Sequence, residues 1–238
     1  CWYRYHQLFS DLLNLRLISK WESLVPVLHQ RASSWLSDNG LKREAVDHAL
    51  NARDYGLAAR LIEEVAEMYW DRGKESQMMQ WLRRLPDECL ESNPKLCIFY
   101  ARELFKSGDL DDAEKKLQVA EQIIDSTSIN CQNKQNLQGR IAVIRAYISS
   151  RTGEVSRIIH FANLALKLLP QKDLMWRSVA ATTLGFGYGW AGEGDCVKAQ
   201  QAFSRAMKNS QTAGNLYHYV FSGSCLGGVL LMRGKLKQ

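Results

Sequence analysis

The sequence is poor in the residues and patterns that interrupt helices. Only four prolines occur in 238 residues, and few stretches alternate apolar and polar residues with the period of two that is typical of strands. Leu, Ala, Lys, Arg, Glu and Gln, which favour helix, are abundant instead. These features exclude a β-sandwich, a β-barrel and an alternating β–α nucleotide-binding fold, and they predict an all-α chain.

The motifs of common catalytic and metal sites are also missing. The sequence has no GxxxxGK[ST] phosphate loop, no HExxH, no CxxC and no serine or cysteine nucleophile motif. We therefore expect that this chain is not an enzyme and that it holds no metal and no cofactor. The scattered cysteines are typical of reduced thiols and favour a cytoplasmic protein.

Long hydrophobic runs are absent as well. The uncharged stretch at residues 215–232 contains Asn, Tyr, His and three glycines, which makes it a poor membrane span and a better buried helix. We expect no membrane partner. The sequence opens on Cys1 and Trp2 rather than on Met, and we expect it to be a segment of a longer protein.

An internal repeat is the most informative feature that is present. Glycines that precede an Ala-containing helix recur at intervals of 33 to 45 residues, at Gly40, Gly73, Gly108, Gly153, Gly194 and Gly234. This spacing is typical of helical hairpins of tetratricopeptide (TPR) type, with each glycine at a turn. It predicts a TPR-like solenoid wound as a right-handed superhelix, with its last hairpin truncated after Gly234.

Stacked hairpins would place the first helix of each on an inner wall, where side chains not needed for packing face a groove. Counting from the turn glycines predicts a ligand or partner groove lined by Arg102, Phe105, Arg140, Tyr147, Trp176, Arg177, Tyr188, Tyr217 and Phe221. Flat rings and guanidinium donors suit sugars, peptides or aromatic ligands. The alternative is that these aromatic residues pack in the core.

Two other patterns allow more than one interpretation. The formal net charge of +6 and a pI near 9.0 raise the possibility of nucleic-acid binding, with Arg83, Arg84, Lys115, Lys116, Arg140, Arg145 and Arg151 as candidate phosphate contacts. Acidic residues interleave with these along the sequence, which favours an ordinary solvated surface. The alternating Gly185, Gly187 and Gly189 lack GxGxxG spacing and a preceding strand, so we predict a tightly packed helix there.

The N-terminal third carries a family resemblance. Residues 2–9 (WYRYHQLF), followed by Asp11, Leu12 and Leu13, resemble the tail of the winged-helix segment in large LuxR-type transcriptional activators of the MalT kind. Residues 28–35 (LHQRASSW) and 44–50 (EAVDHAL) resemble the first helical repeats of that family. The resemblance covers roughly the first 90 residues, and beyond them only the repeat pattern continues it.

The resemblance implies a role for the chain. In that family an ATP- or ADP-binding module precedes the winged helix, a repeat sensor follows, and a helix-turn-helix DNA-binding domain ends the protein. Residues 1–25 would be the winged-helix tail, 26–92 the first hairpins, and 93–238 sensor repeats. The sensor would bind a small-molecule inducer or a regulatory protein, while the parent protein self-associates and binds DNA. The alternative is a TPR adaptor that binds a peptide or protein partner.

Overall fold

The computed structural model describes residues 6–71, 75–189 and 194–234. Within these ranges all regular structure is helical, which confirms the predicted all-α class. None of the helices described is long and apolar enough to cross a bilayer. The chain forms two compact units, residues 1–70 with 74–90 and residues 71–73 with 91–238, and each is described by itself.

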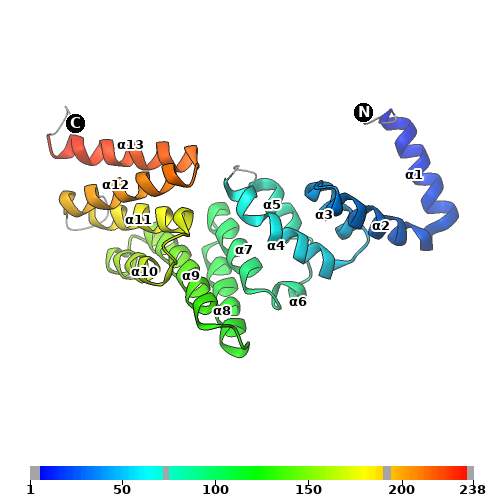
Figure 1. Ribbon diagram of the computed structural model, residues 1–238, viewed down its shortest axis with the longest axis horizontal. Helices are drawn as coiled ribbons and strands as arrows, with labels where there is room; N and C mark the ends of the chain where they lie inside the picture. The colour runs from blue at the N-terminus through cyan, green and yellow to red at the C-terminus, as the bar shows by residue number, and fades with distance from the viewer. Residues whose placement is uncertain (1–5, 72–74, 190–193, 235–238) are drawn as a thin grey trace. The chain divides into compact units, whose positions relative to one another are not determined.

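The first unit is a series of short helices. They are α1 (Gln7–Trp21), the 3-10 turn η1 (Glu22–Leu24), α2 (Val25–Asp38), α3 (Lys42–Asn51), α4 (Tyr55–Asp71), α5 (Glu75–Leu82) and α6 (Asp87–Leu90) (Figure 1). Gly40, at φ +75°, makes the predicted turn between α2 and α3. The turn predicted at Gly73 lies outside the described residues. Pro86 follows the end of α5, as expected of a residue that cannot continue a helix.

Small side chains and specific hydrogen bonds hold this unit together. Ala45 and Ala49 of α3 are fully buried, and the Ser33 hydroxyl on α2 donates to the Ala45 carbonyl at 2.8 Å. The indole N–H of Trp81 on α5 donates to Asp47 on α3 at 2.7 Å. Because the Trp81 ring is itself completely buried, this bond satisfies a donor that would otherwise be costly to bury.

The described residues of the second unit form three hairpins and a further helix. The hairpins are α7 (Pro94–Ser107) with α8 (Leu110–Ser126), α9 (Cys131–Thr152) with α10 (Val155–Leu168), and α11 (Leu174–Gly189) with α12 (Cys196–Thr212); α13 (Leu216–Met232) follows (Figure 1). The first helices also contact one another, with α7 on α9, α9 on α11 and α11 on α13. Residues on neighbouring first helices are therefore brought side by side.

The turn glycines have the conformation that the repeat pattern predicts. Gly108, Gly153 and Gly194 have φ of +93°, +75° and +69°, and the N–H of Gly108 bonds the carbonyls of Leu104 and Phe105 at the end of α7. A Cβ added at any of the three glycines would meet nothing within 4 Å, so the requirement is for backbone conformation and not for space.

The glycines inside α11 are required for space and not for backbone conformation. The predicted helix is confirmed through Gly189, and a Cβ on Gly185 would lie 2.6 Å from the ring of Phe203 on α12. A Cβ on Gly187 would lie 2.9 Å from Ile159 on α10. The absence of side chains therefore lets both neighbouring helices approach α11, which offsets the low helix propensity of glycine.

This close approach gives a paired test of stability. Gly185→Ala should destabilise the chain by about 1–3 kcal/mol, because the Phe203 ring has to move. Gly227→Ala on α13, where a Cβ would meet nothing, should stabilise it by up to about 1 kcal/mol through helix propensity. Urea unfolding followed by circular dichroism measures both. Equal effects of the two substitutions would contradict the packing argument.

Candidate functional site

The nine residues predicted to line a groove all lie on the first helices of the second unit. Arg102 and Phe105 are on α7, Arg140 and Tyr147 on α9, Trp176, Arg177 and Tyr188 on α11, and Tyr217 and Phe221 on α13. Because these helices pack against one another in sequence, several of the side chains meet as pairs. Their burial differs widely and separates them by role.

Phe105 and Tyr147 form the first pair. Their rings stack with centroids 5.1 Å apart and an interplanar angle of 10°. The Arg151 guanidinium lies 5.5 Å from the Phe105 ring, in the range of a cation–π contact. Phe105 is buried and Tyr147 is half-buried, so the tyrosine presents the accessible surface of this pair.

Arg140 and Trp176 form the second pair. The guanidinium lies 5.0 Å from the Trp176 ring and forms an ion pair with Asp173 at 3.0 Å. Trp176 has no exposed surface and packs edge-on to Phe99. In this conformation Trp176 belongs to the core, as the alternative interpretation of the aromatic residues holds, and only Arg140, whose side chain is 12% exposed, keeps some surface.

Arg102 and Arg177 are each only 2% exposed. Arg102 forms an ion pair with Glu103 at 3.1 Å. Arg177 donates to the carbonyls of Leu166 and Leu169 at 2.9 and 2.7 Å, which satisfies acceptors at the end of α10. Burial, and then repulsion from Arg205, lowers the pKa of Arg177. Both arginines are thus engaged in helix packing here.

The aromatic residues of α13 are the most accessible. Tyr217 is 74% exposed and Phe221 37%, and their rings are parallel within 3° at 6.3 Å. Tyr188 on α11 is half-buried beneath the Lys198 ammonium at 5.4 Å. We define the accessible aromatic surface as Arg140, Tyr147, Tyr188, Tyr217 and Phe221.

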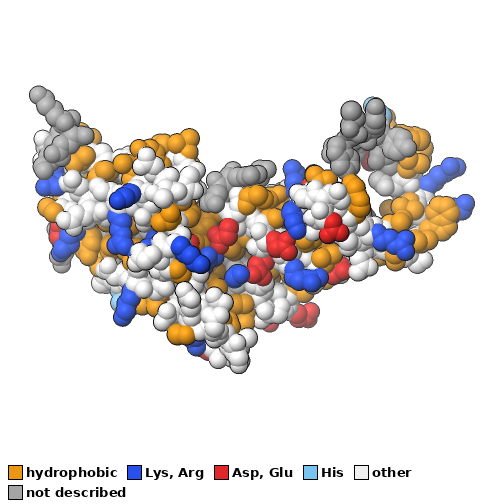
Figure 2. Space-filling view, in the orientation of Figure 1, with side chains coloured by type: hydrophobic (Ala, Val, Ile, Leu, Met, Phe, Trp, Pro, Cys, Tyr) orange, Lys and Arg blue, Asp and Glu red, His pale blue; other side chains and the backbone are white. Residues whose placement is uncertain are grey.

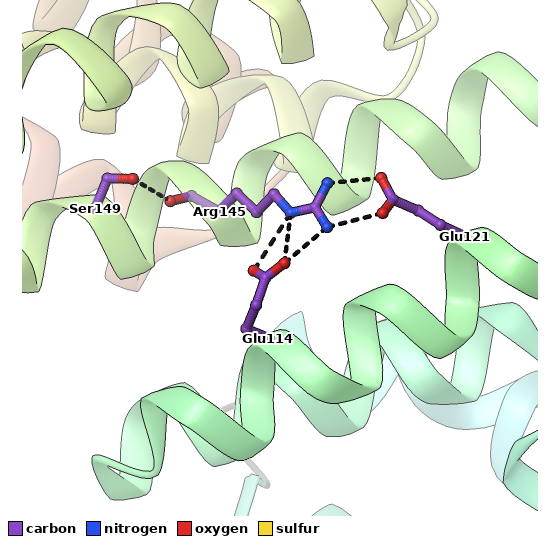
Figure 3. A network of polar contacts seen from close by, with 4 residues as sticks. All are labelled: Glu114, Glu121, Arg145 and Ser149. Carbon is purple, nitrogen blue, oxygen red and sulfur yellow. Dashed lines mark hydrogen bonds and ion pairs between the residues drawn. The ribbon is translucent and has the colours of Figure 1, made fainter.

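A polar network fixes α9, which carries part of this surface. Arg145 on α9 bonds two carboxylates of α8, Glu114 at 2.7 Å and Glu121 at 2.6 Å (Figure 3). Burial of Arg145 disfavours its charge, but the hydrogen bonds to Glu121 and Glu114 outweigh this and raise its pKa. The Ser149 hydroxyl donates to the Arg145 carbonyl at 2.8 Å. The network joins the second hairpin to the first.

Several basic residues that were candidate phosphate contacts have partners within the chain. Arg145 is held by two glutamates, Arg140 by Asp173 and Lys115 by Asp112, and Arg84 donates to Asn51. On the face drawn in Figure 2, Lys and Arg side chains are scattered among acidic and uncharged ones. This distribution favours the ordinary solvated surface over a nucleic-acid interface.

The arginine network can be tested by removing its centre. Arg145→Met should destabilise the chain by roughly 1.5–3 kcal/mol, because two partly buried carboxylates lose charged hydrogen bonds and repel each other. Chemical unfolding gives the free energy. Restoring stability by adding Glu114→Gln and Glu121→Gln would support this account. The exposed Lys167→Met on α10 is the control and should stay within about 0.5 kcal/mol of the parent.

Two histidines meet in the first unit. His29 on α2 and His48 on α3 have their Nδ1 atoms 2.8 Å apart, so one nitrogen must donate and the other accept. Burial and then the charge of His48 lower the pKa of His29. Among the residues described, no group of three or more His, Cys, Asp or Glu is placed to hold a metal ion.

This pair predicts a pH dependence of stability. The folded chain holds the pKa of His29 below its ordinary value of 6.5, so the unfolded chain binds the proton first as the pH falls through that value. The free energy of unfolding should therefore decrease from pH 7 towards pH 5. His29→Gln should flatten this slope, whereas the exposed His160→Gln should not. Parallel urea titrations would reject the idea if the two variants behaved alike.

The sequence is similar to those of several known proteins. No protein-family model matches the chain. The serine/threonine-protein kinase PknK of Mycobacterium tuberculosis is 37% identical over 95 residues, which are 40% of this chain and 9% of the kinase. The HTH-type transcriptional regulator MalT of Serratia proteamaculans is 28% identical over 81% of this chain, and MalT of Yersinia enterocolitica is 26% identical over 92%.

These matches confirm the predicted relationship to MalT-type transcriptional regulators. The similarity extends well past the first 90 residues, to which the sequence motifs had confined the specific resemblance. The chain spans 21% and 24% of the length of these two MalT regulators and 9% of PknK.

Proposed function

We propose that this chain is a ligand- or partner-sensing repeat region of a MalT-like transcriptional regulator. The observation that carries the proposal is the accessible aromatic surface, whose members lie on α9, α11 and α13, in a chain whose relatives include transcriptional regulators. The chain acts by binding and not by catalysis. The modules that bind ATP or ADP and DNA lie in other parts of the parent regulator, which is cytoplasmic and self-associates.

The proposed architecture is a TPR-like right-handed solenoid. The first helices of the second unit contact one another and their turns have left-handed glycines, both of which are typical of stacked helical hairpins. In this arrangement residues 1–25 are the tail of a winged helix, 26–92 are the first hairpins and 93–238 are the sensor repeats.

The chemistry of the surface suits a ligand with flat apolar faces and hydrogen-bonding groups. Tyrosine rings provide large contacts at low entropic cost, and their hydroxyl groups donate or accept. Arg140 adds a donor that its ion pair with Asp173 holds in place. A small inducer or a regulatory protein that prefers one state of the regulator would shift its population by that difference in affinity.

A metabolite screen by thermal unfolding tests the sensor function. An inducer present at about 100 times its dissociation constant should add roughly 2.7 kcal/mol of stability. Tyr217→Ala and Phe221→Ala should reduce this gain because both remove exposed ring contacts. Leu231→Ala, also on α13 and 60% exposed but outside the accessible aromatic surface, is the matched control. A gain that survives both ring deletions would place the ligand elsewhere.

A TPR adaptor for a peptide or protein is the second candidate, and α13 favours it. Beside Tyr217 and Phe221, Leu216 is 73% and Val220 56% exposed, so the helix presents a continuous apolar stripe of the kind that protein partners cover. A metabolite screen without any shift, together with saturable binding of extended peptides in fluorescence anisotropy, would favour the adaptor over the inducer sensor.

A further inference from the structure

A polar recess lies within the first unit, where α2 faces the beginning of α4. It has a volume of about 470 Å³, opens to solvent, and is lined by Gln30, Arg31, Ser34, Asp54, Leu57 and Arg60. The volume falls in the range of small-molecule sites. None of the nine residues predicted to line the groove belongs to this unit.

Two cationic side chains that line the recess have no bonding partner among the described residues. Among the residues that the structure describes, neither the Arg31 nor the Arg60 side chain has a hydrogen bond, an ion pair or a ring contact. Arg140 and Arg145 of the second unit, by contrast, are each held by carboxylates. Guanidinium groups stay charged at any physiological pH and present several donors. Arg31 comes from α2 and Arg60 from α4, so they approach the recess from two helices.

The one acidic residue of the recess is largely occupied. Asp54 Oδ1 accepts the N–H of Leu57 at 3.0 Å, which caps α4, and Oδ2 accepts the side-chain amide of Gln30 at 2.9 Å. Carboxylate oxygens can accept more than one bond, so Asp54 keeps capacity for a hydroxyl donor. The recess therefore combines two free cations with an acceptor held in a fixed position.

We propose that this recess binds a small phosphorylated polyol or sugar. The phosphoryl group contacts Arg31 and Arg60, and the hydroxyl groups of the ligand donate to Asp54. A phosphoryl group has three terminal oxygens and close to two negative charges, so it can engage two guanidinium groups at once, whereas a carboxylate has two oxygens and a single charge. Asp54 opposes a bare polyanion and favours a ligand that also carries donors. The site is independent of the proposed sensor function, because it uses no residue of the accessible aromatic surface.

Isothermal titration of the 238-residue chain with inorganic phosphate and glucose 6-phosphate tests the site, with glucose and acetate at matched ionic strength as comparison ligands. Arg31→Gln and Arg60→Gln should each weaken both phosphate ligands at least about tenfold. Arg43→Gln, an exposed arginine of α3 outside the recess, should leave affinity unchanged. Circular dichroism verifies that each variant is folded.

Asp54→Asn makes the test directional. Asparagine still caps a helix, but it removes the negative charge, so inorganic phosphate should bind more tightly to this variant. No saturable binding of either phosphate ligand would overturn the proposal. An equal loss in Arg43→Gln would overturn it too, since net charge alone would then explain binding. Binding of a single-stranded oligonucleotide without binding of glucose 6-phosphate would show a nucleic-acid surface instead.

Discussion

Close contact between helices through small side chains is the constraint on which the second unit depends. Ala113, Ala120, Ala162, Ala199 and Ala206 are fully buried, all on the second helices of their hairpins. Gly185 and Gly187 supply the same property on α11, where even one methyl group would clash. Because interiors are packed as tightly as organic crystals, the distance between two helices is set by these small residues and not by the larger ones around them.

Close packing also decides which large side chains remain for binding. Where neighbouring helices meet over α11, Trp176, Val179 and Thr183 are enclosed completely. Fewer helices contact α13 than contact α11, and Tyr217 on α13 is mostly exposed. An aromatic side chain is thus part of the core on α11 and exposed to solvent on α13.

The sequence could predict the helices and turns because their signals are local. A glycine that must adopt positive φ, such as Gly108, encodes its conformation in one residue. The roles of the groove residues could not be assigned in this way. Residues 175–183 of α11 are buried without interruption, so no apolar stripe shows which side of the helix faces a ligand, and counting from the turn cannot separate Trp176 from Tyr188.

Pairs formed between distant parts of the sequence were beyond prediction for a related reason. Arg145 lies 31 residues from Glu114 and His29 lies 19 residues from His48, so only the folded chain brings them together.

The aromatic rings near α13 connect the exposed face of this helix to the core. Phe186 touches both the exposed Phe221 and the buried Phe203, and Phe203 rests against Gly185. A ligand that displaces the Phe221 ring would therefore act, through Phe186 and Phe203, on the close contact between α12 and Gly185 of α11.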